Sequence, residues 1–266
     1  YNRLVNLTQE EKDKGVIAAS AGNHAQGVAM SAGKLGISAT IVMPKTTPLI
    51  KVEAVKSRGA RVVLKGDSYD QAYQHALTLA EEKNATFIHP FDDELVIAGQ
   101  GTVGMEILRQ HNKPLDYIFV PVGGGGLIAG ISAYVKYVSP ETKVIGVEPE
   151  DAPTLYKAME AKRRVTLKQV GIFADGVAVA QIGKETFRIA RECVDEVILV
   201  TTDEICAAIK DVFDDTRTVA EPAGALSIAG MKKFGEQNKL ADKSMVAIES
   251  GANINFDRLR HVAERA

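Results

Sequence analysis

The sequence predicts a doubly wound α/β fold, in which parallel sheets are covered by helices on both faces. Two observations predict this class. Short runs rich in β-branched and aromatic residues alternate with longer stretches whose apolar residues recur about every 3.6 positions. The connections between them are short and carry Gly, Pro or Asp, as strand–helix–strand units require. With 266 residues, the chain is long enough for one large domain or two smaller ones.

Each element is expected where one of these two patterns is continuous. The expected strands are Val16–Ser20, Ala39–Met43, Arg61–Leu64, Phe87–His89, Tyr117–Val122, Lys143–Val147, Val197–Val200 and Met245–Ile248. The expected helices are His24–Leu35, Tyr69–Lys83, Thr102–Gln110, Leu127–Val138, Lys184–Arg191, Asp203–Asp214 and Gly224–Phe234. The stretch Ala98-Gly99-Gln100-Gly101 interrupts the pattern. We therefore place a domain boundary there, between residues 1–97 and residues 98–266.

Composition and charge exclude several classes of protein. The 32 Lys and Arg residues nearly balance 34 Asp and Glu, so no global positive field attracts nucleic acid. The apolar runs are far shorter than the ~20 residues that a membrane-spanning helix needs, and no signal segment opens the chain. A cytoplasmic location is therefore expected. Cys193 and Cys206 lack the spacing of a zinc site or a disulfide framework, so we expect reduced thiols and no metal.

A run of four glycines follows the expected strand Tyr117–Val122. Gly123, Gly124, Gly125 and Gly126 stand directly before an expected helix. Without side chains the backbone can approach a phosphate closely, and several N–H groups converge at the positive end of the helix dipole. A tight turn that binds nothing needs only one or two glycines. The run therefore predicts a phosphate site, with Val122 at its edge.

A dinucleotide site is an alternative for the same segment. Gly124, Gly126 and Ala129 fit the G-x-G-x-x-A fingerprint, and Glu148 ends the next expected strand, where such sites place an acidic residue. On this segment alone the two interpretations remain open.

A polar loop, Ser20 to Gly27, lies between the first expected strand and its helix. Ser20 and Asn23 are residues that cap helix N-termini, which is one explanation of the loop. The alternative is that Ser20 and the nearby amides hold a carboxylate, while the Asn23 amide donates to a phenolic oxygen. His24 is a candidate base, although a histidine in a first helical turn has its pKa lowered by the dipole and often only packs. A third loop carries Ser250, again after an expected strand, either as a turn residue or as part of the same site.

These loops together resemble the threonine dehydratase (threonine ammonia-lyase) family across essentially the whole chain. The segments that carry the resemblance are Ser-Ala-Gly-Asn-His-Ala-Gln-Gly at 20–27, Val-Ile-Ala-Gly-Gln-Gly-Thr at 96–102, Val-Gly-Gly-Gly-Gly-Leu at 122–127, Phe-Ala-Asp-Gly-Val-Ala-Val at 173–179, Ala-Glu-Pro-Ala-Gly-Ala at 220–225 and Ser-Gly-Ala-Asn at 250–253. The ending after Ser250 resembles the biosynthetic, isoleucine-regulated branch. The resemblance implies the tryptophan-synthase-β-like fold, with two doubly wound α/β domains and a pyridoxal 5'-phosphate cleft between them.

The resemblance also implies roles for individual residues. The amides of Gly123–Gly126, with Val122, would hold the cofactor phosphate, Asn23 would contact the ring's phenolic oxygen, and Ser250 would face the pyridine nitrogen. The substrate carboxylate would lie against Ser20, Ala21, Gly22 and His24. The implied reaction converts L-threonine, and secondarily L-serine, to 2-oxobutanoate (or the matching keto acid) and ammonia, in a cytoplasmic homo-oligomer that binds neither nucleic acid nor membrane.

One departure from the family concerns the catalytic lysine. The Schiff-base lysine of the family belongs to a Ser-Phe-Lys-x-Arg-Gly-Ala-Tyr-Asn motif, whose last two residues match Tyr1 and Asn2. The resemblance thus places the lysine upstream of Tyr1, leaves this chain without a catalytic residue, and leads us to expect an inactive fragment. The alternatives are a serine dehydratase or racemase of the same fold, although related racemases carry serine where Ala21 stands, and a non-catalytic phosphate- or amino-acid-binding domain.

Overall fold

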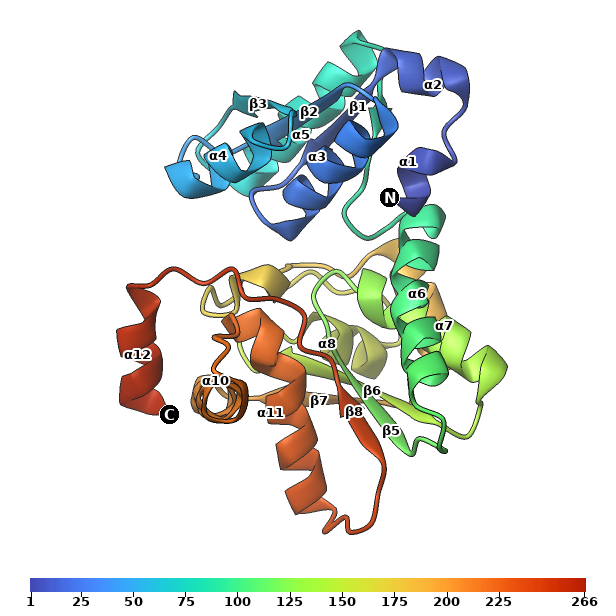
Figure 1. Cartoon of the computed structure of the whole chain (residues 1–266), viewed down its shortest axis with the longest axis vertical. Coiled ribbons are helices and arrows are strands. Elements are labelled where there is room, and N and C mark those ends of the chain that lie inside the picture. The colour runs from blue at the N-terminus through green and yellow to red at the C-terminus, as the bar shows by residue number, and fades with distance from the viewer. The chain divides into compact units, whose positions relative to one another are not determined.

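The chain folds into two compact units, Tyr1–Gly99 and Gln100–Ala266, each built around its own sheet (Figure 1). The structure is a computed structural model that describes residues 1–266. Each sheet has four strands, all parallel, with helices on both faces. The predicted doubly wound α/β class is confirmed. Because the strands are parallel, the loops that follow them gather at one edge of each sheet.

Unit 1 has the strand order β3-β2-β1-β4. Its strands are β1 (Val16–Ala19), β2 (Ala39–Met43), β3 (Arg61–Leu64) and β4 (Thr86–Phe87). Its helices are α1 (Asn2–Val5), α2 (Gln9–Lys14), α3 (Asn23–Leu35), α4 (Leu49–Lys56) and α5 (Tyr69–Glu82). Alternate residues of β1 enter opposite cores: Val16 and Ala18 pack with α3 and α4, whereas Ile17 and Ala19 pack with α5. The continuous apolar strand is therefore buried on both faces, as parallel sheets require.

Unit 2 has the strand order β7-β6-β5-β8. Its strands are β5 (Tyr117–Pro121), β6 (Lys143–Pro149), β7 (Glu196–Val200) and β8 (Met245–Ala247). Its helices are α7 (Gly126–Val138), α8 (Thr154–Ala161), the 3₁₀ helix η1 (Asp175–Val177), α9 (Lys184–Cys193), α10 (Thr202–Thr216), α11 (Pro222–Gln237) and α12 (Arg258–Arg265). Ile118 and Val120 face α7, α8 and α9, while Phe119 faces α10 and α11.

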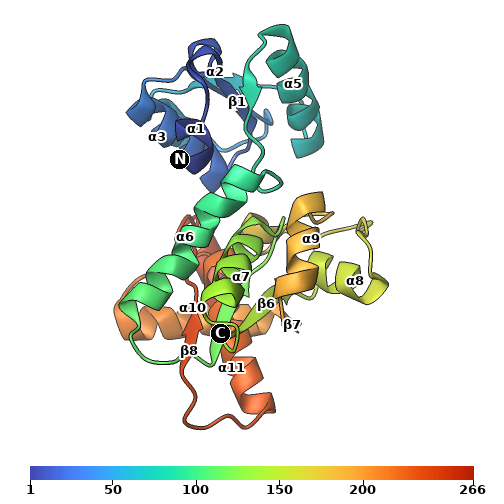
Figure 2. The ribbon, with the colours of Figure 1, turned by 90° about the vertical axis from the view of Figure 1, so that its right-hand side faces the viewer.

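The expected interruption of secondary structure at Ala98–Gly101 is wrong, because these residues lie within a continuous helix, α6 (Glu94–Gln110), although the two compact units do divide between Gly99 and Gln100. Gly101 allows two helices to pack closely and does not form a turn. A Cβ there would lie 2.9 Å from the carbonyl oxygen of Gly130 in α7, so the absent side chain lets the two helix backbones approach closely (Figure 2). Glycines inside a helix cost helix propensity but permit this contact.

Side-chain capping fixes the start of the short helix α2 and of the longer helix α10. Thr8 and Glu11 form a capping box at the start of α2, and Thr201 and Glu204 form another at α10. Cys193 and Cys206 are free thiols. None of the helices combines the length and hydropathy needed to cross a bilayer.

Candidate functional site

The four glycines lie where β5 gives way to α7. Gly125 is the N-cap residue of α7 and has φ +90°, in the left-handed region, and no side chain caps this helix. The carbonyl of Gly124 is turned toward α9, where it accepts hydrogen bonds from Thr186 Oγ1 at 2.8 Å and from Gly183 N at 3.3 Å. Because the Gly124 carbonyl points toward α9, the polar groups at the start of α7 are the N–H groups of the glycine run.

The backbone N–H groups of Gly123, Gly124, Gly125 and Gly126 donate no hydrogen bond within the chain. Gly124, Gly125 and Gly126 are nevertheless buried, and buried amides of folded proteins are normally paired. Together with the helix dipole of α7, these donors form a cradle for an anion. Val122, whose N–H donates to the Val147 carbonyl at 2.9 Å, belongs to the sheet and only borders the cradle.

The walls of the cradle explain why glycine is needed. A Cβ at Gly123 would lie 3.0 Å from the Cα of Val177 in η1. A Cβ at Gly125 would lie 2.6 Å from Ile182 Cδ1 and 3.0 Å from the Thr186 side chain. Side chains at either position would therefore fill the space between the loop and its neighbours and move the amides.

Glu148 is not available to bind a nucleotide ribose, the role that the dinucleotide interpretation gives it. Its side chain is fully buried, and its two carboxyl oxygens accept the N–H groups of Leu155 at 2.7 Å and Tyr156 at 2.8 Å, at the start of α8. Burial raises the pKa of Glu148 to about 8, although the hydrogen bonds from α8 oppose this shift. Its role is to cap a helix, which removes the acidic residue that the dinucleotide fingerprint needs.

Ser250 follows β8, which pairs in parallel with β5, so its loop and the glycine run lie at the same edge of the sheet. The Ser250 hydroxyl donates to the Ala223 carbonyl at 3.4 Å, and its N–H donates to the Gly224 carbonyl at 3.4 Å. Gly224 permits this approach, since a Cβ there would lie 2.1 Å from the Gly251 carbonyl oxygen. Ser250 itself is exposed and can reach a ligand.

Glu221 is a supporting residue that the sequence reasoning did not single out. It is buried at the N-cap of α11, its N–H donates to Gly251 O at 3.0 Å, and its carboxylate accepts the Asn253 N–H at 3.2 Å. Glu221 thus holds the loop that carries Ser250 from both sides. The Ala-Glu-Pro-Ala-Gly-Ala segment was the available signal, because a proline is favoured at the first position of a helix and the residue before it is then the N-cap.

In unit 1, the loop at 20–27 connects β1 to α3. The N-cap residue is Gly22, whose position has no side-chain cap, so neither Ser20 nor Asn23 is the N-cap residue that the capping explanation of the loop requires. Ser20 instead accepts the Gly22 N–H on its Oγ at 3.2 Å, which tightens the turn and leaves its hydroxyl hydrogen available. Asn23 is the exposed first residue of α3, and Ala21 lies between them.

His24 ties α3 to the segment after β4. Its Nε2 lies 3.1 Å from the Ile88 carbonyl oxygen, and because a carbonyl only accepts, Nε2 carries the proton. Burial is the main reason that the pKa of His24 falls to about 4, with nearby His89 as a smaller cause. The shift has the expected direction, and burial is its largest cause. A neutral, anchored imidazole is a positioning group and a poor proton acceptor at Nε2.

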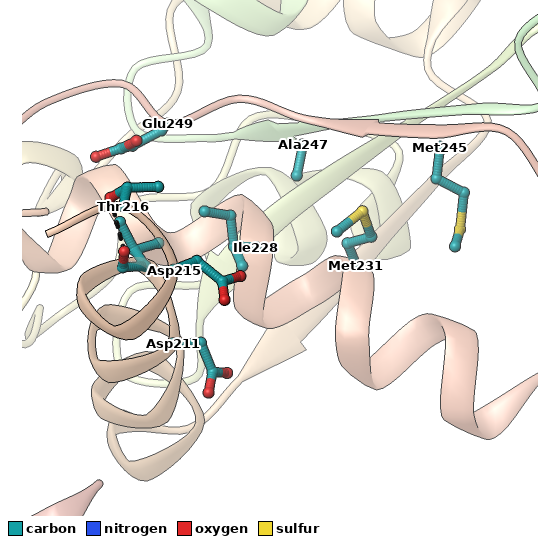
Figure 3. Close-up of a pocket in the computed structure, with 9 residues that line it drawn as sticks. Asp211, Asp215, Thr216, Ile228, Met231, Met245, Ala247 and Glu249 are labelled. Carbon is teal, nitrogen blue, oxygen red and sulfur yellow. Dashed lines mark hydrogen bonds between the residues drawn. The ribbon is translucent and has the colours of Figure 1, made fainter. Parts of the chain in front are cut away.

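A cavity of about 310 Å³ lies elsewhere in unit 2, among α10, α11 and β8 (Figure 3). Ile228, Met231 and Met245 contribute apolar surface, and Asp215 and Glu249 contribute carboxylates. None of the site residues expected from the sequence lines it. The cavity is therefore not the anion cradle, although Glu249 directly precedes Ser250.

Comparison with known proteins gives consistent results. The biosynthetic L-threonine dehydratase of Burkholderia multivorans is 55% identical over 269 residues, and the chloroplastic biosynthetic threonine dehydratase of Arabidopsis thaliana is 61% identical over 266 residues. Both alignments cover 100% of this chain, but only 53% and 45% of the two relatives. The chain thus spans about half the length of the curated relatives it matches.

A solved structure and a family match extend the comparison. The processed form of threonine deaminase isoform 2 from Solanum lycopersicum superposes with a TM-score of 0.98 at 50% identity, over 100% of this chain and 77% of that one. The family described as pyridoxal-phosphate dependent enzymes matches residues 1–251. The expected resemblance is therefore confirmed, and this chain belongs to the family of pyridoxal-phosphate dependent enzymes.

Proposed function

We propose that the protein carrying this chain deaminates L-threonine to 2-oxobutanoate and ammonia with pyridoxal 5'-phosphate, as a step of isoleucine biosynthesis. The observation that carries the proposal is the cradle of unpaired amides at Gly123–Gly126, which suits the cofactor phosphate. The names of the Burkholderia and Arabidopsis relatives support the substrate and the biosynthetic role.

The residues of the chain fit the cofactor. The four amides and the positive end of the α7 dipole would neutralise the phosphate, and Val122 would close the edge of the cradle. Ser250, an exposed neutral hydroxyl, would hydrogen-bond to the pyridine nitrogen, and Asn23 would donate to the phenolic oxygen. When bound, the cofactor supplies the electron sink that permits loss of the α-proton and of the β-hydroxyl.

The loop of unit 1 would orient the substrate. The Ser20 hydroxyl hydrogen can donate to the substrate carboxylate, because its oxygen already accepts from the Gly22 amide. Ala21 and Gly22 leave room for that carboxylate. His24 would act by fixing the start of α3 through Ile88, because its Nε2–H is already engaged.

The narrower features of the proposal concern specificity, assembly and location. L-serine is a secondary substrate, since its hydroxyl is also β to the carboxylate. A homo-oligomer is proposed, and sedimentation of the purified protein tests it. A cytoplasmic location draws support from the bacterial relatives, whereas relatives with chloroplastic and mitochondrial names make cell fractionation the appropriate test.

The decisive experiment uses the protein at its full natural length, loaded with pyridoxal phosphate. We expect 2-oxobutanoate and ammonia in equal amounts from L-threonine, and no product from D-threonine or after removal of the cofactor. Addition of NAD in place of pyridoxal phosphate is the control for the dinucleotide alternative. A protein that binds pyridoxal phosphate but forms no keto acid from L-threonine or L-serine would favour the non-catalytic binding domain instead.

A further inference from the structure

Arg258 lies outside all the loops described above, yet it contacts the segment that backs the glycine run. It is the first residue of α12, and its Nη2 donates to the Ile172 carbonyl at 3.2 Å. Its Nη1 lies 3.6 Å from Asp175 Oδ1, and its guanidinium lies over the Phe173 ring, 5.6 Å from the centroid. The Arg258 side chain thus contacts three of the four successive residues 172–175.

The segment held by Arg258 forms one wall of the anion cradle. It continues into η1, where the Val177 N–H donates to the Ala174 carbonyl at 3.0 Å, and both residues are buried. Val177 is the residue whose Cα would lie 3.0 Å from a Cβ at Gly123. Movement of this turn would therefore change the space in which the Gly123 amide is held.

Arg258 also connects this turn to the loop that carries Ser250. Arg258 lies at the end of the short segment that follows Ser250, and α12 is itself fixed to the core of unit 2. Val262 is buried in the same cluster as α10 residues, and Arg265 Nε lies 2.7 Å from Asp203 Oδ1. The guanidinium therefore links a helix anchored through Val262 and Arg265 to the wall of the cradle.

We propose that Arg258 is a positioning residue for phosphate binding, which keeps the Ile172–Val177 turn pressed against the glycine run. Its planar guanidinium can satisfy a carbonyl and a carboxylate while stacking on a ring, which a lysine ammonium cannot do at once. The inference rests on the proposed function, because it assumes that the cradle holds the phosphate of the cofactor. It adds a residue to which neither the glycine motif nor the serine loop points.

The test compares Arg258→Ala, Arg258→Lys and the control Arg260→Ala in the full-length protein. Arg260 lies on the same helix, is exposed, and pairs only locally with Glu264 at 2.8 Å. We expect the dissociation constant of pyridoxal phosphate to rise about tenfold in Arg258→Ala, the loss of about 1.4 kcal/mol. Arg258→Lys should recover part of this loss, and Arg260→Ala should match the parent.

Pyridoxal, which lacks the phosphate, distinguishes positioning of the cradle from general damage. Its affinity should be unchanged in Arg258→Ala, and turnover of L-threonine at saturating pyridoxal phosphate should remain near that of the parent. Equal losses of affinity for both compounds, or a lower melting temperature with unchanged affinity for pyridoxal phosphate, would overturn the inference. Failure of the proposed function has a different signature, since the parent itself would then fail to bind pyridoxal phosphate or to form keto acid.

Discussion

Backbone amides, rather than charged side chains, make up the candidate anion site of this chain. No Lys or Arg is needed among Gly123–Gly126, because four N–H donors and the dipole of α7 provide the positive potential. The arrangement depends on the left-handed φ of Gly125, which an L-residue rarely adopts, and on the anchoring of the Gly124 carbonyl by Thr186. Substitutions at Gly123–Gly126 should therefore weaken phosphate binding by moving backbone N–H groups, not by removing a side-chain contact.

Gly125→Ala should weaken cofactor binding strongly. The new Cβ would need a left-handed backbone and would meet Ile182 and Thr186 at 3.0 Å or less, so the loop must shift. We expect the dissociation constant of pyridoxal phosphate to rise at least tenfold and the melting temperature to fall. Gly235→Ala in α11 is the control, because its Cβ has no neighbour within 4 Å and alanine favours the helix. Parental cofactor affinity in Gly125→Ala would show that the loop does not hold the phosphate.

Ala21→Ser should introduce epimerisation of the substrate. A methyl group cannot donate a proton, so Ala21 would offer no acid to a deprotonated substrate, which would then lose its β-hydroxyl. The parent should give keto acid from L-threonine without epimerised threonine, whereas the serine variant should give measurable epimer. Chiral chromatography of the residual substrate is the measurement. Substantial epimerisation by the parent would mean that another residue supplies the proton.

At the level of elements, two buried titratable groups fix the helices that surround the candidate loops. His24 joins α3 to the Ile88 carbonyl in unit 1, and Glu148 joins β6 to the start of α8 in unit 2. The pKa of His24 is lowered to about 4, so unfolding takes up a proton between about pH 4 and 6.5 and stability rises with pH there. Glu148 has the opposite effect, because its raised pKa makes unfolding release a proton.

Glu148→Gln should remove part of the pH dependence of stability. The unfolded carboxyl ionises near 4.5 and the folded one near 8, so its ionisation lowers the free energy of unfolding as pH rises through this interval. Urea unfolding from pH 5 to 8 should therefore show a less negative slope in the variant than in the parent. Exposed Glu236 provides the matched control, Glu236→Gln. Parallel curves for the parent and Glu148→Gln would contradict this assignment.

In the whole molecule, each of the four buried clusters draws its residues from a single unit, two from each. Ile41 is fully buried in unit 1 and Ile145 in unit 2, and each belongs to a central strand. Each unit thus has a complete hydrophobic core around its own sheet, as an independently stable domain requires. A substitution that destabilises one core should therefore lower mainly the stability of its own unit.

Ile41→Ala should lower the stability of unit 1 by about 2–5 kcal/mol, the usual effect of a cavity in a packed core. Hydrogen exchange followed by peptide should quicken in β1, β2 and β3 while peptides of β5 and β6 keep their protection. Ile145→Ala is the mirror control and should give the reverse pattern. Equal acceleration in both units after either substitution would show that they unfold together.

The sequence by itself determined the fold class, most strands and the positions of the loops that carry the candidate site residues. Strands such as Ala39–Met43 were predictable because both faces of a parallel strand are buried, which gives continuous β-branched runs. The glycine run was predictable because four consecutive glycines are rarely needed for anything except close backbone approach. Pattern-based prediction failed where the same residue type serves two purposes, as at Gly101, whose role in helix packing is visible only beside Gly130.

Only the tertiary structure decided which polar residues are exposed in the candidate loops and which support the framework. Ser20, His24 and Glu148 are all candidate functional residues in the sequence, but their partners, Gly22, Ile88 and the start of α8, are set by the fold. The roles of Glu221 and Arg258 were not visible in the sequence, because their hydrogen bonds join segments far apart in the chain. Local sequence specifies propensity and spacing, whereas burial and long-range pairing fix the charge, tautomer and direction of a side chain.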